Sequence, residues 1–277
     1  MEFDAEAYLI ETGARADPEI DLFQTVIALA SSHYKGRTFE RYFRHFEKLS
    51  AALKEACAKQ AGGNPALKLK ILADVMFDQF DYASDADTPN PLQAADMIAV
   101  IDQRKGGRDA MAILCAALAR DQGWTVEGLS IPAFSALRLV DEGQILLFDP
   151  LERCKILNAA DIRNALKAMQ GKQAELSAAY FEPCGNREML LRLQNLIKFH
   201  LIDLGDYAEA LKIVEHMRKI APQDHRVLLD AGVLYSKTGC DDQAIEALKL
   251  YLECDISYAD RRDALDLLSF IEGGARL

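Results

Sequence analysis

The strongest constraint on the fold of this chain is a pattern near its C-terminus that recurs every 34 residues. The matching positions are Leu201, Gly205, Ala210 and Val214 in one copy, and Tyr235, Gly239, Ala244 and Leu248 in the next. This period is typical of stacked helix pairs, in which a glycine ends the first helix and a small residue lets the helices cross closely. The C-terminal part of the chain is therefore expected to be helical, with each pair burying an apolar face on its neighbour.

The period is that of the tetratricopeptide repeat. Gly205-Asp206-Tyr207 and Pro222 fit the first repeat, Ala231-Gly232 fits the second, and Ile256 stands where the second proline would be. The segment Ala259–Ile271 is expected to form a cap helix that shields the last repeat from solvent. We assign residues 186–277 to a tetratricopeptide domain with this cap.

Such repeats present their first helices on a concave surface. In the usual geometry, the inner positions fall on Arg192, Asn195, Phe199 and Asp203 in the first repeat, and on Arg226, Leu229, Val233 and Lys237 in the second. Three cations around two large apolar side chains suit an extended or helical peptide that carries acidic groups. Alternatively, the N-terminal helices of the chain fill this groove themselves, and the sequence leaves both possibilities open.

Upstream of the repeats, the pattern predicts helices over residues 3–60 and then a mixed unit. Gly62-Gly63-Asn64-Pro65 is a break between the two. Three strand-like runs follow a long apolar helix, at Thr125–Ile131, Phe134–Val140 and Gln144–Phe148, and a hairpin signal joins the last two. The fold class is therefore α+β and mostly helical, with domains at residues 1–64, 65–185 and 186–277 and a small antiparallel sheet in the middle domain.

The segment from Thr38 to Leu49 carries aromatic residues at helical spacing, with basic residues between them. The basic residues in and just before this segment are Lys35, Arg37, Arg41, Arg44, His45 and Lys48. The segment is either an RNA-binding helix or an amphipathic helix with its aromatic side chains in the core. We favour the second, because the aromatic residues form one stripe. A net charge of -11 also argues against nucleic acid as a partner.

The remaining composition excludes several classes of protein. The N-terminus has no apolar run like that of a secretory signal, and the longest apolar stretch, Ala110–Ala119, is too short to span a membrane. We therefore expect a cytoplasmic protein that does not act at a membrane. The six cysteines are scattered without a CxxC pair, so we expect neither a metal site nor a cofactor.

An ordered set of motifs in the middle of the chain resembles the SirB-type transglutaminase-like family of bacteria. These motifs are Met97–Gly106, the apolar helix after it, Gly123-Trp124, Gly128, Pro132 and Phe148-Asp149-Pro150. The resemblance covers roughly residues 65–272. It implies a papain-like, transglutaminase-like domain followed by tetratricopeptide repeats, in the order found here.

The resemblance also implies where a catalytic triad would lie. Active domains of this kind use a cysteine at a helix N-terminus, a histidine on the next strand and an aspartate on the one after. Carried over to this chain, those positions fall on Asp109, Phe134 and Asp149, so only the acid is kept. No cysteine, serine or threonine lies between Arg104 and Leu114. The resemblance therefore implies a degenerate member without catalytic residues.

The function that we expect is that of a non-catalytic interaction, scaffold or regulatory protein that binds a protein or peptide through its repeats. Two alternatives remain. A thiol-dependent enzyme acting on protein amide bonds would need Cys154 or Cys115 together with an imidazole such as that of His200. A metal or small-ligand sensor would use Asp109 and Asp149.

Overall fold

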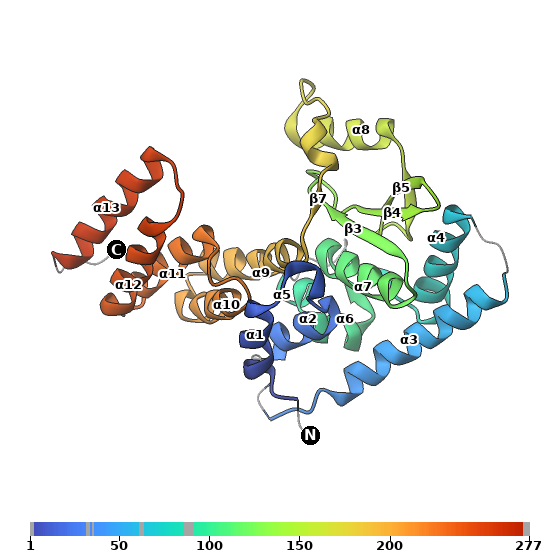
Figure 1. Cartoon of the computed structure of the whole chain (residues 1–277), viewed down its shortest axis with the longest axis horizontal. Coiled ribbons are helices and arrows are strands. Elements are labelled where there is room, and N and C mark those ends of the chain that lie inside the picture. Colours follow the sequence, from blue (N-terminus) through green and yellow to red (C-terminus); the bar gives the residue numbers. More distant parts are fainter. Residues whose placement is uncertain (1–2, 32–33, 35, 61–63, 86–90, 274–277) are drawn as a thin grey trace. The chain divides into compact units, whose positions relative to one another are not determined.

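The computed structural model describes residues 3–31, 34, 36–60, 64–85 and 91–273. Lys35 and the predicted break at Gly62-Gly63 lie outside these residues. The chain forms two compact units: unit 1 consists of Met1–Ala5 and Ala16–Leu193, and unit 2 of Glu6–Arg15 and Gln194–Leu277 (Figure 1). The mostly helical α+β fold expected from the sequence is confirmed.

Unit 1 is organised around one apolar helix, α7 (Arg108–Asp121), in which every residue from Ala110 to Ala119 is buried. Its other helices are α2 (Leu22–Ser31), α3 (Glu40–Ala58), α4 (Pro65–Ala73), α5 (Pro91–Ala95), α6 (Met97–Gln103) and α8 (Ala159–Gln170). Short 3-10 turns lie at Asp17–Glu19 and Ala178–Phe181, and a π-helical turn extends α4 over Asp74–Gln79. The helices α2, α3 and α5 all pack against α7.

Helix α3 is amphipathic, as predicted. Tyr42 is buried, and the ring of Phe46 stacks on that of Phe23 in α2, with 4.1 Å between ring centroids. Phe43 also meets Phe23, edge to face, with centroids 6.2 Å apart. Aromatic pairs of this kind add to the free energy gained by burying their area. The aromatic stripe of α3 is therefore part of the core, and Arg41, Arg44 and Lys48 are left at the surface while His45 is half-buried.

The sheet of unit 1 is antiparallel, with strand order β6-β5-β4-β3-β7. Its strands are β3 (Thr125–Leu129), β4 (Leu137–Asp141), β5 (Gln144–Asp149), β6 (Lys155–Leu157) and β7 (Pro183–Cys184), and a separate parallel pair joins β1 (Ala83–Ser84) to β2 (Lys105–Gly106). The predicted hairpin is confirmed: β4 and β5 are joined by Glu142 and Gly143, both with positive φ. The sequence placed the start of β4 at Phe134, which is three residues too early, because Ala133 turns the chain with a φ of 71°.

Helix α8 covers the sheet through a second apolar cluster. This cluster contains Leu129, Ile131, Ala136, Leu157, Ile162 and Leu166. It lets a short sheet bury one of its faces, which a sheet of this size needs for stability.

The first residues of helix α9 (Asn186–Asp203) are held by a residue far away in the sequence. Asp17 accepts hydrogen bonds from the backbone N–H groups of Asn186 (2.7 Å) and Arg187 (2.9 Å). It lies 169 residues before Asn186 and supplies acceptors to N–H groups that the helix itself cannot satisfy. The first turn of α9 is thereby tied into unit 1, where Gly128 of β3 lies close to Met189.

Unit 2 has the repeat architecture that the period predicts. After α9, which belongs to unit 2 from Gln194 onward, come α10 (Tyr207–Ile220), α11 (His225–Lys237), α12 (Asp241–Glu253) and α13 (Tyr258–Glu272). Gly205 and Gly239 end equivalent helices with φ of 76° and 77°, a conformation that side chains with a Cβ rarely adopt. The cap helix predicted at 259–271 is confirmed as α13.

Unit 2 also contains a helix from the N-terminus of the chain. Helix α1 (Ala5–Ala14) lies against the C-terminal end of α10, where Glu6 forms an ion pair with Lys219 at 2.8 Å. Gly13 packs so closely on the backbone of Lys219 that an added Cβ would overlap its carbonyl oxygen. One N-terminal helix therefore extends the repeat stack at α10.

We predict that Gly13→Ala destabilises the protein. Replacing glycine by alanine inside a helix normally stabilises it by up to about 1 kcal/mol. Here the added methyl group meets backbone that cannot move aside, so we expect a loss of about 1–3 kcal/mol in chemical unfolding. Ala14→Gly, on the exposed side of the same helix, serves as the control and should cost only the ordinary helix propensity. A Gly13→Ala protein as stable as the wild type would disprove the packing of α1 on α10.

Candidate functional site

The three positions to which the family resemblance assigns a catalytic triad lie at or between the ends of elements of unit 1. Asp109 is the second residue of α7, Phe134 lies in the turn before β4, and Asp149 is the last residue of β5. Because α7 is buried along nearly its whole length, its N-terminus is fixed against the sheet.

Asp109 is engaged by a hydroxyl group. Ser135 donates a hydrogen bond to its carboxylate over 2.9 Å, and Ser135 is only 5% exposed. A serine becomes a nucleophile when a base such as imidazole takes its proton. A carboxylate is a much weaker base than imidazole for this purpose, and the bond joins α7 to the segment before β4. The sequence analysis missed Ser135 because no local motif marks it.

Phe134 takes part in packing. Its ring packs against the apolar cluster beneath α8. Arg108 donates to the carbonyl oxygen of Ala133, and its guanidinium carbon lies 6.0 Å from the centroid of the Phe134 ring. Arg108 and the cluster together hold the turn in which Phe134 lies.

Asp149 is buried, with 1% of its surface exposed. Its carboxylate accepts a hydrogen bond from the backbone N–H of Leu151 at 2.9 Å. Burial raises the pKa of this carboxyl group, while the Leu151 bond and the positive charge of Arg108 oppose the rise. The turn that follows is tight, because Arg153 and Cys154 both have positive φ. The acid therefore stabilises the turn after β5 through the backbone.

The two cysteines considered as nucleophiles are buried near this acid. Cys115 is fully buried on α7 and donates to the sulfur of Met76 over 3.3 Å, and Cys154 is 4% exposed. The neighbouring Cys154 thiol and burial hold the pKa of Cys115 well above its usual value, and the charge of Asp149 adds to this. A catalytic thiol needs the opposite, a lowered pKa and access to solvent.

No imidazole serves these groups within the described part of unit 1. The histidine of this unit that the structure describes is His45, which hydrogen bonds to the Tyr82 hydroxyl and to Arg104. Across the residues placed by the structure, no group of three His, Cys, Asp or Glu side chains is arranged to hold a metal ion.

Arg192, one of the residues predicted to line the repeat groove, makes its contacts in unit 1. Its guanidinium donates to the carbonyl oxygen of Leu129 over 3.0 Å and to the sulfur of Cys184 over 3.2 Å. Its side chain thus links the start of α9 to the strands β3 and β7.

In unit 2, the first helices of the two repeats are joined by an ion pair that the sequence analysis did not identify. Lys198 of α9 is 2% exposed and pairs with Asp230 of α11. Its ammonium group also lies 4.2 Å from the centroid of the Phe199 ring, which is itself 55% exposed. A buried lysine is strongly disfavoured without a partner, so Asp230 fixes α9 against α11.

The other predicted groove residues differ in their exposure. Asp203, Arg226 and Lys237 are exposed, whereas Asn195, Leu229 and Val233 are half-buried. Leu229 packs against the clusters formed by α12 and α13. The exposed charged positions, together with Phe199, are the ones available to a partner.

Comparisons with known proteins match both parts of the chain. A sequence model of the transglutaminase-like superfamily matches residues 40–195, and one of the tetratricopeptide repeat matches residues 201–258. Two UPF0162 proteins of Xylella fastidiosa, from strains Temecula1 and 9a5c, are 25% and 24% identical over 191 residues, which is 68% of each chain. A UPF0162 protein of Pseudomonas aeruginosa is 26% identical over 223 residues, 79% of each chain. No helix in the described ranges is both long enough and apolar enough to cross a bilayer.

We predict that Asp149→Asn changes how stability depends on pH. The pKa of Asp149 in the folded protein lies above its usual value of 3.8. At a pH between that usual value and the folded pKa, the folded protein therefore binds more protons than the unfolded chain. Stability contributed by this group therefore falls as pH rises from about 4. Asparagine keeps an acceptor for Leu151 and does not titrate, so the variant should gain stability relative to wild type towards neutral pH.

The measurement is the melting temperature of both proteins across acidic and neutral pH. Asp149→Ala is the control: it also removes the titration but loses the Leu151 hydrogen bond, so it should show the same pH trend at lower stability. A difference between wild type and Asp149→Asn that does not vary with pH would contradict the expectation.

Proposed function

The chain belongs to the transglutaminase-like superfamily, and we propose that it is a degenerate, non-catalytic member that works as an interaction or scaffold protein through its tetratricopeptide repeats. The observation that carries this proposal is the state of the three triad positions. Asp109 is bonded to Ser135, Phe134 packs in the core, and Asp149 binds the backbone of its own turn. None of the three supplies the thiol or the imidazole that an active domain of this kind uses, and both carboxylates are engaged by hydrogen bonds.

The neighbouring groups support the same proposal. The thiols of Cys115 and Cys154 are buried, and the pKa of Cys115 is raised. The His45 ring, on α3, is engaged by Tyr82 and Arg104. All six cysteines are free thiols, which supports a reducing compartment and hence a cytoplasmic location.

The proposed partner is a protein or peptide with acidic groups, bound on the first helices of the repeats. Phe199, Arg226 and Lys237 offer one exposed aromatic ring and two exposed cations for this contact. Arg192 is also one of the residues predicted to line the groove, but its guanidinium already donates a hydrogen bond to the carbonyl oxygen of Leu129 in unit 1. Tetratricopeptide repeats generally bind extended or helical segments in this way.

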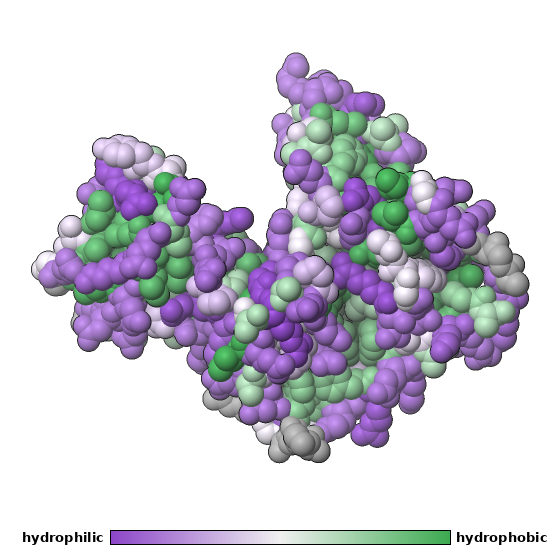
Figure 2. All heavy atoms as spheres, viewed as in Figure 1, coloured by the Kyte–Doolittle hydropathy of each residue, from purple (hydrophilic) through white to green (hydrophobic). Residues whose placement is uncertain are grey.

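Exposed apolar residues of the last two helices support an interaction role as well. Figure 2 shows hydrophobic side chains gathered on the visible face over α12 and α13. Leu250 of α12 and Leu265 and Phe270 of α13 are exposed. Apolar surface that stays open to water often marks an interaction site.

We predict that alkylation of the native protein spares the buried thiols. At neutral pH, iodoacetamide should modify the half-buried Cys57, Cys240 and Cys254 slowly, and Cys115, Cys154 and Cys184 only after unfolding. Peptide mass spectrometry after short exposure measures the order of labelling. Early and selective labelling of Cys115 or Cys154 would instead favour the thiol-dependent enzyme.

We further predict that Arg226→Glu/Lys237→Glu abolishes capture of the partner in a pull-down from the source organism. Both side chains are exposed, so the variant should remain folded by circular dichroism. Lys54→Glu/Lys172→Glu makes the same change in charge at exposed positions of unit 1 and should retain every partner. If the Arg226/Lys237 variant keeps all its partners, this surface is not the binding site.

A further inference from the structure

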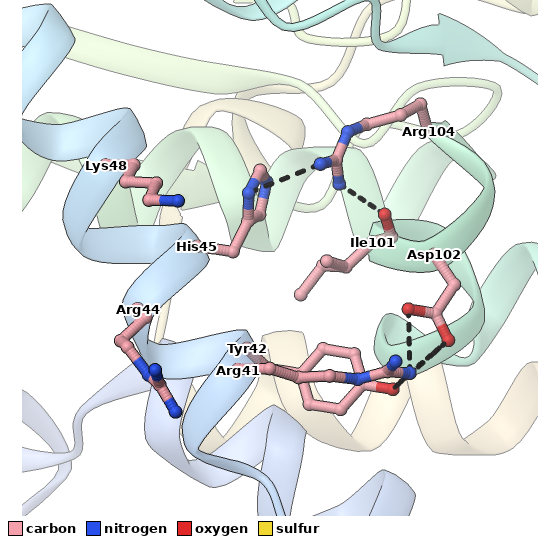
Figure 3. Close-up of a pocket in the computed structure, with 8 residues that line it drawn as sticks. All are labelled: Arg41, Tyr42, Arg44, His45, Lys48, Ile101, Asp102 and Arg104. Atoms are coloured by element: carbon pink, nitrogen blue, oxygen red, sulfur yellow. Dashed lines mark hydrogen bonds and ion pairs between the residues drawn. The ribbon is translucent and has the colours of Figure 1, made fainter.

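Unit 1 contains an open hollow between α3 and the C-terminal end of α6 that neither the family nor the proposed role assigns to any ligand. It has a volume of about 380 Å³ and is lined by Arg41, Tyr42, Arg44, His45, Lys48, Ile101, Asp102 and Arg104 (Figure 3). Small-molecule sites in proteins have volumes of roughly 300–1,000 Å³. The hollow is therefore large enough for a small ligand.

The lining is strongly cationic on a protein with a net charge of -11. Arg41, Arg44 and Lys48 follow one another at three- and four-residue spacing, which places them on one face of α3. Arg104, at the end of α6, lies across the hollow from α3 with its guanidinium beside His45, on the side of Lys48 (Figure 3). Like charges held together repel one another, so such a cluster is stabilised when an anion binds.

One of the four cations is neutralised within the site. Asp102 receives hydrogen bonds from the Arg41 guanidinium at 2.8 and 3.0 Å and from the Tyr42 hydroxyl at 3.1 Å. Arg44 and Lys48 are exposed, and neither forms an ion pair with any residue that the structure describes. Three cations, on Arg44, Lys48 and Arg104, are left without a carboxylate partner in the hollow.

Arg104 is fixed in place before any ligand arrives. Its backbone is left-handed, with φ of 58°, and its guanidinium donates to the carbonyl oxygen of Ile101 and to Nδ1 of His45, the latter at 3.3 Å. A guanidinium can only donate, so Nδ1 accepts and Nε2 carries the proton that is donated to the Tyr82 hydroxyl at 3.0 Å. Burial lowers the pKa of His45 to about 4, helped by the charges of Arg104 and Lys48.

His45 is therefore a neutral support at physiological pH, held between Tyr82 and Arg104. Arg104 also donates a hydrogen bond to the carbonyl oxygen of Ile101 at the C-terminal end of α6. This bond offsets the partial negative charge of the helix end, which would otherwise disfavour an anion. An arginine held in this way loses little side-chain entropy on binding, which increases affinity.

We propose that this hollow binds a small phosphorylated molecule, with Lys48 and Arg104, on either side of His45, as its main anion-binding groups and Arg44 adding positive charge at the rim (Figure 3). The fork of a guanidinium and the point charge of an ammonium group are the side-chain groups best suited to phosphate oxygens. Ile101, which is only 4% exposed, closes the floor of the hollow between α3 and Arg104. The site is independent of the triad positions and of the repeats, so it adds a ligand to the scaffold role.

A nucleic acid fits this site less well. Binding of single strands relies on aromatic rings on which bases stack. The aromatic residues of α3 are used in the core, since Phe46 stacks on Phe23 and Tyr42 is buried beneath Arg41. The hollow thus offers charges for phosphate without a platform for bases.

The test is titration of the full chain with inorganic phosphate and with glycerol phosphate by calorimetry, at constant ionic strength. Arg44→Gln/Lys48→Gln removes two exposed cations and should weaken binding at least about tenfold. Lys54→Gln/Lys172→Gln makes the same change in charge elsewhere on unit 1 and should bind like wild type. Asp102→Asn removes the carboxylate that pairs with Arg41 and should strengthen binding several-fold. Because a misfolded variant would bind more weakly, this gain in affinity could not come from loss of folding.

Three results would overturn the proposal. One is the absence of binding of both probes to wild type up to about 10 mM. Another is equal affinity of wild type and Arg44→Gln/Lys48→Gln. The third is binding of a short single-stranded RNA that depends on Arg44 and Lys48 while neither phosphate probe binds, which would assign the surface to nucleic acid.

Discussion

The structure of unit 1 depends on the burial of α7. Ten consecutive residues of this helix are removed from water, so the helix has no face that could be left at the surface. The helices α2, α3 and α5 and strand β3 pack around it. At its C-terminal end, Arg120 donates to Val126 of β3 over 2.8 Å and to Asn186 of α9 over 2.7 Å. The hydrophobic effect thus positions α7, and the hydrogen bonds of Arg120 at its C-terminal end hold β3 and α9 in place.

The same burial explains the contrast between the two polar regions of unit 1. Two carboxylates accept hydrogen bonds from within unit 1. Asp109, at the start of α7, accepts one from Ser135, and Asp149, at the end of β5, accepts one from the backbone N–H of Leu151. The hydrogen-bond acceptors of both carboxylates are thus engaged inside unit 1, and the desolvation of Asp149 raises its pKa. Beside α3, in contrast, Arg44 and Lys48 stay in water without partners. Unpaired charge at an open surface is what a ligand can recognise, which is why the two regions lead to different conclusions.

Sequence reasoning was most successful where structure depends on local spacing. The helix pairs of unit 2, the hairpin after β4 and the amphipathic character of α3 all follow from patterns within fewer than forty residues. It erred at the start of β4, because the positive φ of Ala133 depends on packing that includes Arg108, which lies well before it in the chain. Ser135, Lys198 and Asp230 escaped notice for the same reason, since each acquires its role from a partner on another element.

The sequence by itself determined the fold class and the two kinds of domain, because both follow from residue type and period. Only the tertiary structure decided that α1 packs on α10, that Asp17 caps α9, and that Arg104 stands opposite α3. Contacts of this kind join residues between about 60 and more than 200 positions apart. Their geometry is set by how buried faces fit together, which is information that no local pattern in the chain contains.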